Sequence, residues 1–334
     1  MSRRLDEHAR GVFVISATPF AEDGALDLES ADRLMDFYLG HGVDGVTLLG
    51  IMGEAPKLTQ EESLAFVDRA LKRLQGRIPA VIGVSQPGLR PLAVFARQVM
   101  DLGAAGVMVA PTPGLRGDRQ VYDYYAQVFA LLGPDIPVVL QDYPQSSGVH
   151  LDAEVFHRLV DAFPQLVMLK HEDCPGLAKL SPIRAESAAS GRRRVSILIG
   201  NGGLYYIQEL QRGADGAMTG YAYPEMLVEV HRRFAAGDRD GAEDLYDLHL
   251  PLLKHEQQPG FGLSVRKEVL RRRGAIRSAK LRAPGGQLAA ADLAELDRLI
   301  LRLERRLVAG QVPRLVKLCH SAGHLSCDQA ACNR

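Results

Sequence analysis

Lys170 is the residue whose type and position most directly suggest chemistry. It follows a short apolar run, residues 166–169, and is itself followed by His171, Glu172 and Asp173. A lysine at the end of a buried strand can lie in an apolar pocket, where burial disfavours the charged ammonium. The free amine that results can attack a ketone. Most lysines at strand ends reach water, so position alone favours a lysine without a catalytic role. Other residues of the chain are needed to favour the catalytic interpretation.

Three other apolar runs end in residues of chemical interest. Tyr143 could transfer a proton, although a packed tyrosine with a hydrogen-bonded hydroxyl is the ordinary alternative. Gly50 and Gly53 flank a tight turn whose backbone N–H groups could bind a carboxylate, although an ordinary turn between a strand and a helix is an equal alternative. Residues 200–203 are glycine-rich and are expected to leave one sector of the site open. Neighbouring strands lie less than about 5 Å apart, so Tyr143 and Lys170 can reach one pocket, and this pairing favours catalysis.

These residues lie within a repeated pattern of a short apolar run, a Gly/Pro-rich turn and an amphipathic stretch. The apolar runs are residues 11–18, 45–49, 80–84, 106–110, 137–140, 166–169, 195–199 and 216–219. Most are nearly continuous in Val, Ile, Leu and Ala, as expected for parallel strands covered on both faces. Eight such units predict a (β/α)8 TIM barrel, with a doubly wound open sheet as the alternative. Active residues of such barrels lie at the C-terminal ends of the strands.

The stretches between and after the runs have helical spacing. Thr59 and Glu62 form a predicted capping box, and Asp152 is a predicted N-cap. Four more helices are expected after the last strand, over residues 224–235, 238–255, 263–273 and 289–308. We therefore expect a barrel over residues 1–223, a C-terminal helical extension over 224–309 and a disordered tail over 310–334.

The tail contains several side chains that could bind a metal. They are Cys319, His320, His324, Cys327 and Cys332. Their spacing fits no common zinc pattern, so we expect a solvated tail and no metal site.

The composition argues against several classes of protein. The 40 basic and 40 acidic side chains cancel, which gives no electrostatic reason to expect nucleic acid or an anionic membrane as a partner. The first ten residues lack the apolar stretch of a secretory signal, and no apolar run approaches the roughly 20 residues of a transmembrane helix. Four cysteines, three of them in the tail, do not form a disulfide framework. We expect a cytoplasmic, reduced protein.

Several short motifs occur in a fixed order along the chain. They are Ala-Thr-Pro-Phe at 17–20, Gly-Val-Asp-Gly at 42–45, Gly-x-x-Gly-Glu at 50–54, Leu-Thr-x-x-Glu at 58–62 and Gly-Ala-Asp-Gly at 213–216. Together with Tyr143 and Lys170, their order and spacing resemble the dihydrodipicolinate synthase/N-acetylneuraminate lyase family of class I aldolases and dehydratases. The resemblance extends from about Gly11 to about Arg305.

The resemblance implies a role for each candidate residue. Lys170 would form a Schiff base with a 2-oxo acid, and Tyr143 would shuttle protons. The turn from Gly50 to Gly53 would hold the substrate carboxylate, and Met218 would lie against the lysine. It also implies that no metal or organic cofactor is needed and that the protein is a homotetramer, a dimer of dimers.

The chain also departs from the family pattern in three places. Ile51 and Met52 stand where the family usually has at least one hydroxyl residue, and neither can relay a proton. The synthase branch has a tyrosine at the level of residues 111–114 and an arginine at the level of 145–147, and this chain has neither.

The residues around the predicted pocket instead resemble branches that act on 2-keto-3-deoxy sugar acids. The similar segments are residues 139–144 and 170–180. We therefore expect a Schiff-base-forming lyase, an aldolase or a dehydratase, that acts on pyruvate or a 2-keto-3-deoxy acid. The alternatives are a 4-hydroxy-tetrahydrodipicolinate synthase and a catalytically silent barrel that binds a keto acid.

Overall fold

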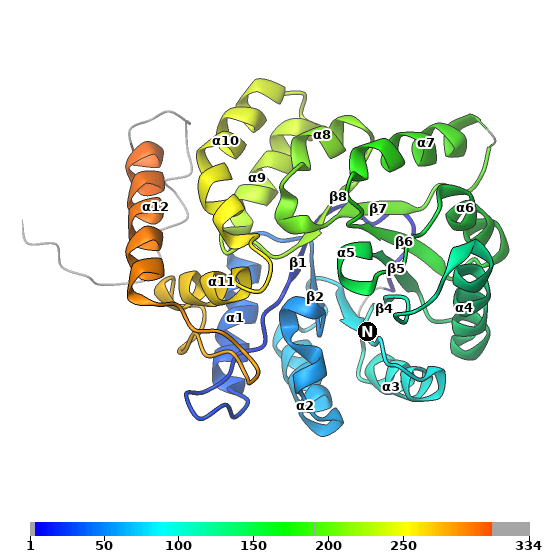
Figure 1. Cartoon of the computed structure of the whole chain (residues 1–334), viewed down its shortest axis with the longest axis horizontal. Helices are drawn as coiled ribbons and strands as arrows, with labels where there is room; N and C mark the ends of the chain where they lie inside the picture. The colour runs from blue at the N-terminus through cyan, green and yellow to red at the C-terminus, as the bar shows by residue number, and fades with distance from the viewer. Residues whose placement is uncertain (1–3, 190, 309–334) are drawn as a thin grey trace, which may run out of the picture.

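The computed structural model describes residues 4–189 and 191–308, and in it eight parallel strands close into a barrel (Figure 1). The strands are β1 (Gly11–Ile15), β2 (Gly45–Leu48), β3 (Ala80–Gly83), β4 (Gly106–Val109), β5 (Val138–Asp142), β6 (Leu166–His171), β7 (Ser196–Ile199) and β8 (Gly216–Thr219). Each strand pairs with its neighbours in sequence, and β8 pairs with β1. The predicted (β/α)8 TIM barrel is thus confirmed, and the open sheet is excluded.

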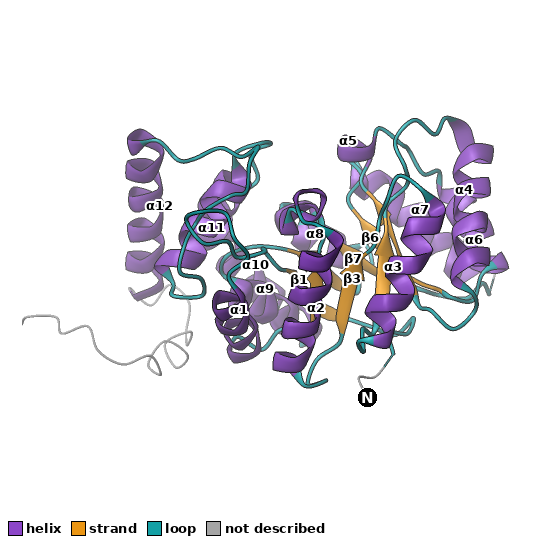
Figure 2. Cartoon of the chain, turned by 90° about the horizontal axis from the view of Figure 1, so that it is seen from below, coloured by secondary structure: helices purple, strands orange, loops and turns teal. Residues whose placement is uncertain are grey.

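Helices cover the outside of the barrel (Figure 2). They are α1 (Leu28–Gly40), α2 (Gln60–Leu74), α3 (Leu89–Asp101), α4 (Gly117–Leu132), α6 (Ala153–Ala162), α7 (Gly176–Ala189) and α8 (Tyr206–Gln211). The predicted capping box is present, since Thr59 Oγ1 accepts from the N–H of Glu62 at 3.2 Å and the Glu62 carboxylate accepts from the N–H of Thr59. Asp152 caps α6 as predicted, by accepting from the N–H of Glu154 at 2.8 Å.

In the described part of the chain, four helices follow the last strand. They are α9 (Pro224–Ala235), α10 (Arg239–Glu256), α11 (Gly262–Arg272) and α12 (Ala290–Val308), close to the predicted ranges. Figure 1 shows α12 standing at one edge of the molecule, beyond α10 and α11. The predicted tail, with its cysteines and histidines, lies outside the described residues. None of the described helices is long and apolar enough to cross a membrane.

The core has two parts, because each strand is covered on both faces. Inside the barrel, a cluster that includes Phe13, Met108, Met168, Leu198 and Met218 fills the space between the strands. A larger cluster fills the layer between the strands and the surrounding helices. The apolar runs are nearly continuous in sequence because both faces of each strand are buried.

The C-terminal ends of β5 and β6 extend beyond the predicted apolar runs. The two strands stay paired as far as Gln141 with Lys170 and Asp142 with His171, although these four residues are polar or charged. Side chains alternate along a strand, so Lys170 shares the interior face with Met168 and His171 takes the other face. The extra residues thus place the lysine inside the paired part of the barrel.

Candidate active site

Lys170 and Tyr143 line one cavity at the C-terminal ends of the strands. Lys170 is only 5% exposed, and its Nζ lies 2.9 Å from Oε2 of Glu172. Glu172 Oε2 also accepts from Nε2 of Gln141, at 2.7 Å. Lys170 and Tyr143 thus share a pocket, as predicted, and the Glu172 carboxylate and the Gln141 amide lie beside the Lys170 amine.

Glu172 is positioned by the continuation of the sheet. Its backbone N–H donates to the carbonyl of Asp142 at 2.9 Å, which extends the pairing of β5 and β6 by one residue. Glu172 is two residues after Lys170, so both side chains point into the barrel. Sequence reasoning assigned no role to Glu172, although its spacing from the lysine on a strand was a usable signal.

Tyr143 follows β5 and precedes the short helix α5 (Pro144–Ser147). The tyrosine is half-buried and lines the cavity with Lys170 and Glu172. Burial raises the pKa of Tyr143, and the negative charge of Glu172 adds to this effect. The phenol is thus protonated at neutral pH and suited to donate a proton.

The turn from Gly50 to Gly53 is a single turn of 3₁₀-helix, η1 (Ile51–Gly53). The N–H of Gly53 donates to the carbonyl of Gly50 at 2.9 Å, so it is used within the turn. The first two residues of such a turn, Ile51 and Met52, have no acceptor for their N–H groups inside it. Both residues line the cavity. Their N–H groups are therefore the proposed binding site for the substrate carboxylate.

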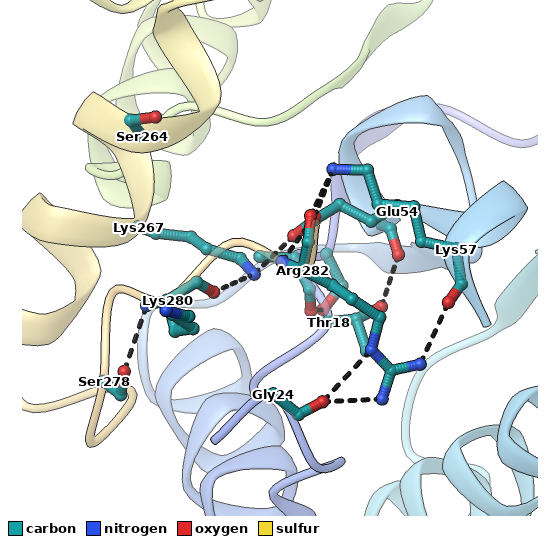
Figure 3. A network of polar contacts seen from close by, with 12 residues as sticks. Thr18, Gly24, Glu54, Lys57, Ser264, Lys267, Ser278, Lys280 and Arg282 are labelled. Carbon is teal, nitrogen blue, oxygen red and sulfur yellow. Dashed lines mark hydrogen bonds and ion pairs between the residues drawn. The ribbon is translucent and has the colours of Figure 1, made fainter. Parts of the chain in front are cut away.

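A network of ions holds this turn against the C-terminal helices (Figure 3). Glu54 directly follows the turn and lies in the left-handed region at φ 54°, where a residue other than glycine is strained. Its carboxylate contacts Nζ of Lys267 on α11 at 2.6 Å and Nζ of Lys57 at 2.8 Å. The N–H of Arg282 donates to the same carboxylate at 3.1 Å. These contacts fix the backbone on the C-terminal side of the turn.

The glycine-rich residues 200–203 lie beside the cavity, since Asn201 and Gly202 line it, and the open sector expected there stays a prediction. A Cβ atom at Gly200 would lie 2.2 Å from Cγ of Glu172, and one at Gly202 would lie 2.1 Å from the side chain of Gln257. The Asn201 side chain also donates to the Glu172 carbonyl at 2.9 Å. The glycines therefore make room for two side chains that line the cavity.

Met218 lies in the interior cluster of the barrel, and the next two residues, Thr219 at the end of β8 and Gly220 after it, line the cavity. Its expected position against Lys170 stays a prediction. The C-terminal extension contributes a cation to the cavity, Arg266, whose Nε donates to Oε1 of buried Glu256 at 2.8 Å. Sequence reasoning missed this arginine because nothing near it in the chain marks it as part of the barrel mouth.

Among residues 4–189 and 191–308, no group of three or more His, Cys, Asp or Glu side chains is arranged to bind a metal ion. The possible ligands of the tail lie outside these residues. What the cavity brings together is an amine, a phenol, a carboxylate and a guanidinium.

A sequence model of the dihydrodipicolinate synthetase family matches residues 8–303. The chain is 30% identical over 301 residues to an L-2-keto-3-deoxyarabonate dehydratase of Azospirillum brasilense, which covers 88% of this chain and 94% of that protein. It is also 30% identical over 306 residues to a 4-hydroxy-tetrahydrodipicolinate synthase of Sorangium cellulosum (strain So ce56). This match covers 89% of this chain and 96% of that protein. Equal identity to two different enzymes leaves the individual reaction open.

A solved structure agrees with these matches. The crystal structure of dihydrodipicolinate synthase from Rhodopseudomonas palustris has a TM-score of 0.88 with this chain and is 48% identical to it. The similarity covers 90% of this chain and all of that one. The fold and the sequence therefore point to the same family.

Proposed function

The chain belongs to the dihydrodipicolinate synthetase family of lyases, and from this premise we propose that it acts on a 2-oxo acid through a Schiff base at Lys170. The Lys170 amine attacks the C2 ketone, and loss of water yields an iminium. The iminium withdraws electrons from C3, so that a C–C bond can break or a β-hydroxyl can leave. Tyr143 transfers the proton that this step needs.

The observation that carries the proposal is the position of Lys170. The lysine is almost completely buried, yet it lines a cavity, and Tyr143 lines the same cavity. A buried amine that still meets a cavity is suited to nucleophilic attack on a carbonyl. The N–H groups of Ile51 and Met52 are proposed to hold the substrate carboxylate, as is common for backbone amides in a tight turn.

We propose a 2-keto-3-deoxy acid as the substrate rather than the two substrates of the lysine-pathway synthase. The cavity is lined by the aliphatic side chains of Ile51 and Met52, which provide no hydroxyl for a relay. Residues 145–147, next to Tyr143, contain no arginine for a second carboxylate. An unpaired carboxylate in a partly apolar pocket is costly, by several kcal/mol.

The two alternatives make different predictions. A 4-hydroxy-tetrahydrodipicolinate synthase would need an arginine for the second carboxylate, and Arg266 is the arginine that lines the cavity among the residues that the structure describes. A silent keto-acid-binding barrel would form the complex without turnover. The presence of both Lys170 and Tyr143 at the cavity argues against a catalytically silent protein.

The assembly and location proposed for the protein follow the family. We infer a homotetramer, a dimer of dimers, in the cytoplasm. Light scattering would test the assembly, since a single chain has a mass of 36.4 kDa.

Borohydride reduction with a panel of 2-oxo acids, followed by mass spectrometry of peptides, tests the chemistry. Pyruvate should add one pyruvyl group to Lys170. Lys179 and Lys267 are built-in controls, because each is bound to carboxylates and neither lines the cavity. Labelling at either of them, with Lys170 unmodified, would refute the assignment.

Turnover assays distinguish the substrates. The purified protein would be incubated with pyruvate and aspartate semialdehyde, and in parallel with 2-keto-3-deoxy sugar acids. We expect turnover in the second assay and little in the first. Efficient condensation in the first assay and none in the second would favour the synthase.

A further inference from the structure

Among the described residues that line the cavity there is one carboxylate, and the proposed roles of Lys170 and Tyr143 do not involve it. Of the described residues that line the cavity, Glu172 alone is acidic. Its Oε2 lies 2.9 Å from Lys170 Nζ, the atom that would become the Schiff-base nitrogen. The side chain is almost completely buried, and Gln141 holds it through a hydrogen bond of 2.7 Å.

We propose that Glu172 is a catalytic residue, the base that removes the C3 proton of the substrate once it is bound to Lys170. This inference rests on the proposed Schiff-base function. In the iminium, C3 is two bonds from the nitrogen, so a carboxylate in contact with that nitrogen lies within reach of the C3 proton. Ile51 and Met52 cannot take this proton, because their side chains have no acceptor.

Each step keeps protons and electrons in balance. Glu172 accepts the C3 proton, and the C3–H electron pair forms the C2–C3 double bond of an enamine as the iminium charge is neutralised. The enamine then expels the C4 hydroxyl, which leaves as water with the proton of Tyr143. The Tyr143 phenolate recovers a proton from Glu172, so the substrate has lost one water and both residues return to their starting forms.

The surroundings assign different tasks to the two acids. Tyr143 is protonated at neutral pH, because burial and the Glu172 charge both raise its pKa, and it is therefore a donor. Glu172 lies against the Lys170 amine and accepts a hydrogen bond from the Gln141 amide, so its carboxyl group is placed to accept a proton. Environments that separate two titratable groups in this way commonly separate acid from base.

Exchange of the methyl protons of pyruvate in D₂O measures the proposed step by itself. Pyruvate has no C4 hydroxyl, so exchange at C3 needs the Schiff base and the C3 base, but no leaving group. We would follow exchange by NMR and measure borohydride trapping on the same full-length samples. For Glu172→Gln, we expect trapping to persist and exchange to fall by roughly 10²–10⁴-fold, the usual contribution of a general base.

Three further variants make the test specific. Glu172→Asp retains a carboxylate and should recover part of the exchange. Tyr143→Phe should keep exchange but lose turnover of 2-keto-3-deoxy acids. Asp173→Asn is the matched control, since Asp173 follows Glu172 directly but is bound to Lys179 at 3.1 Å and does not line the cavity. It should exchange like the wild type.

Several results would overturn the proposal. Unchanged exchange in Glu172→Gln would show that another group removes the proton, and lost exchange in Tyr143→Phe would identify that group as Tyr143. Equal loss of trapping and exchange in Glu172→Gln would reduce Glu172 to a positioning residue for the lysine. A wild-type protein that is never trapped would instead refute the Schiff-base function, whatever Glu172 does.

Discussion

Two buried lysine–glutamate pairs lie near the mouth of this barrel, and within the described part of the chain only the pair of Lys170 lines the active-site cavity. Lys170 contacts Glu172 at 2.9 Å, and Lys267 contacts Glu54 at 2.6 Å. Lys170 is 5% exposed and Lys267 is not exposed at all. By burial and by pairing alone, the two lysines are nearly equivalent.

The difference lies in what else surrounds each amine. Lys267 Nζ also donates to the carbonyl of Lys280 at 2.9 Å and lies over the ring of Phe20 at 4.5 Å, so protein atoms enclose it. Burial lowers the pKa of Lys267 to about 8, although Glu54 opposes this shift. A lysine can therefore be buried, paired and easier to deprotonate, and still be structural because no substrate can reach it. Access to a cavity is what separates Lys170 from it.

The largest expected effect is on turnover when Lys170 is removed. Lys170→Ala should abolish both turnover and borohydride trapping, since no other amine lines the cavity among the described residues. The fold should survive, because Glu172 keeps its hydrogen bond from Gln141 and lines the cavity when Lys170 is absent. Circular dichroism would check the fold. Residual turnover comparable to the wild type would remove the distinction between the two lysines.

Tyr143→Phe should produce the next largest effect. Turnover should fall by roughly 10²–10⁴-fold, the usual size of a general acid–base contribution, while Schiff-base formation stays detectable. The change removes only a hydroxyl from the cavity that Lys170 lines. Steady-state kinetics would measure it, and an unchanged kcat would make Tyr143 a packing residue.

Lys267→Met tests the closed pair and should act on stability. The change leaves Glu54 buried without its closest cation, so the free energy of unfolding should fall by about 3–5 kcal/mol. Chemical denaturation would measure this loss. The double variant Glu54→Gln/Lys267→Met should recover much of it, since it removes both charges. If the single variant were as stable as the wild type, the pair of Lys267 and Glu54 would not stabilise the fold.

Glu209 on α8 sharpens the comparison, because it is a buried carboxyl whose charged neighbours are His171 and Glu172. Burial raises the pKa of Glu209 to about 7; His171 opposes this shift and the Glu172 charge adds to it. Between pH 4.5 and 7 the folded state binds the extra proton, so this group's stabilising contribution is complete below 4.5 and is lost as pH rises through 7.

The size of that loss is up to about 3 kcal/mol, from a shift of about 1.4 kcal/mol per pKa unit. Glu209→Gln should thus be more stable than the wild type at pH 8 and similar to it at pH 4.5. Denaturation curves at the two pH values would show the difference. A difference that does not depend on pH would mean that Glu209 is ionised throughout.

The fold followed closely from the sequence because its signals are local. Apolar runs matched the strands, and Thr59 and Asp152 marked helix starts, because periodicity and caps depend on residues only a few positions apart. The ends of β5 and β6 were missed. Gln141 and Lys170 are polar, and only their pairing across the two strands and their shared contact with Glu172 keep them in the sheet.

By itself the sequence determined a closed barrel with Lys170 and Tyr143 at the ends of consecutive strands, since strand order in such a barrel follows chain order. Only the tertiary structure decided which lysine meets a cavity. Lys267 and Glu54 are 213 residues apart, and Arg266 enters the mouth from α11. Such contacts are set by how the closed barrel and its helical extension pack, and packing over that distance leaves no period or spacing in the chain.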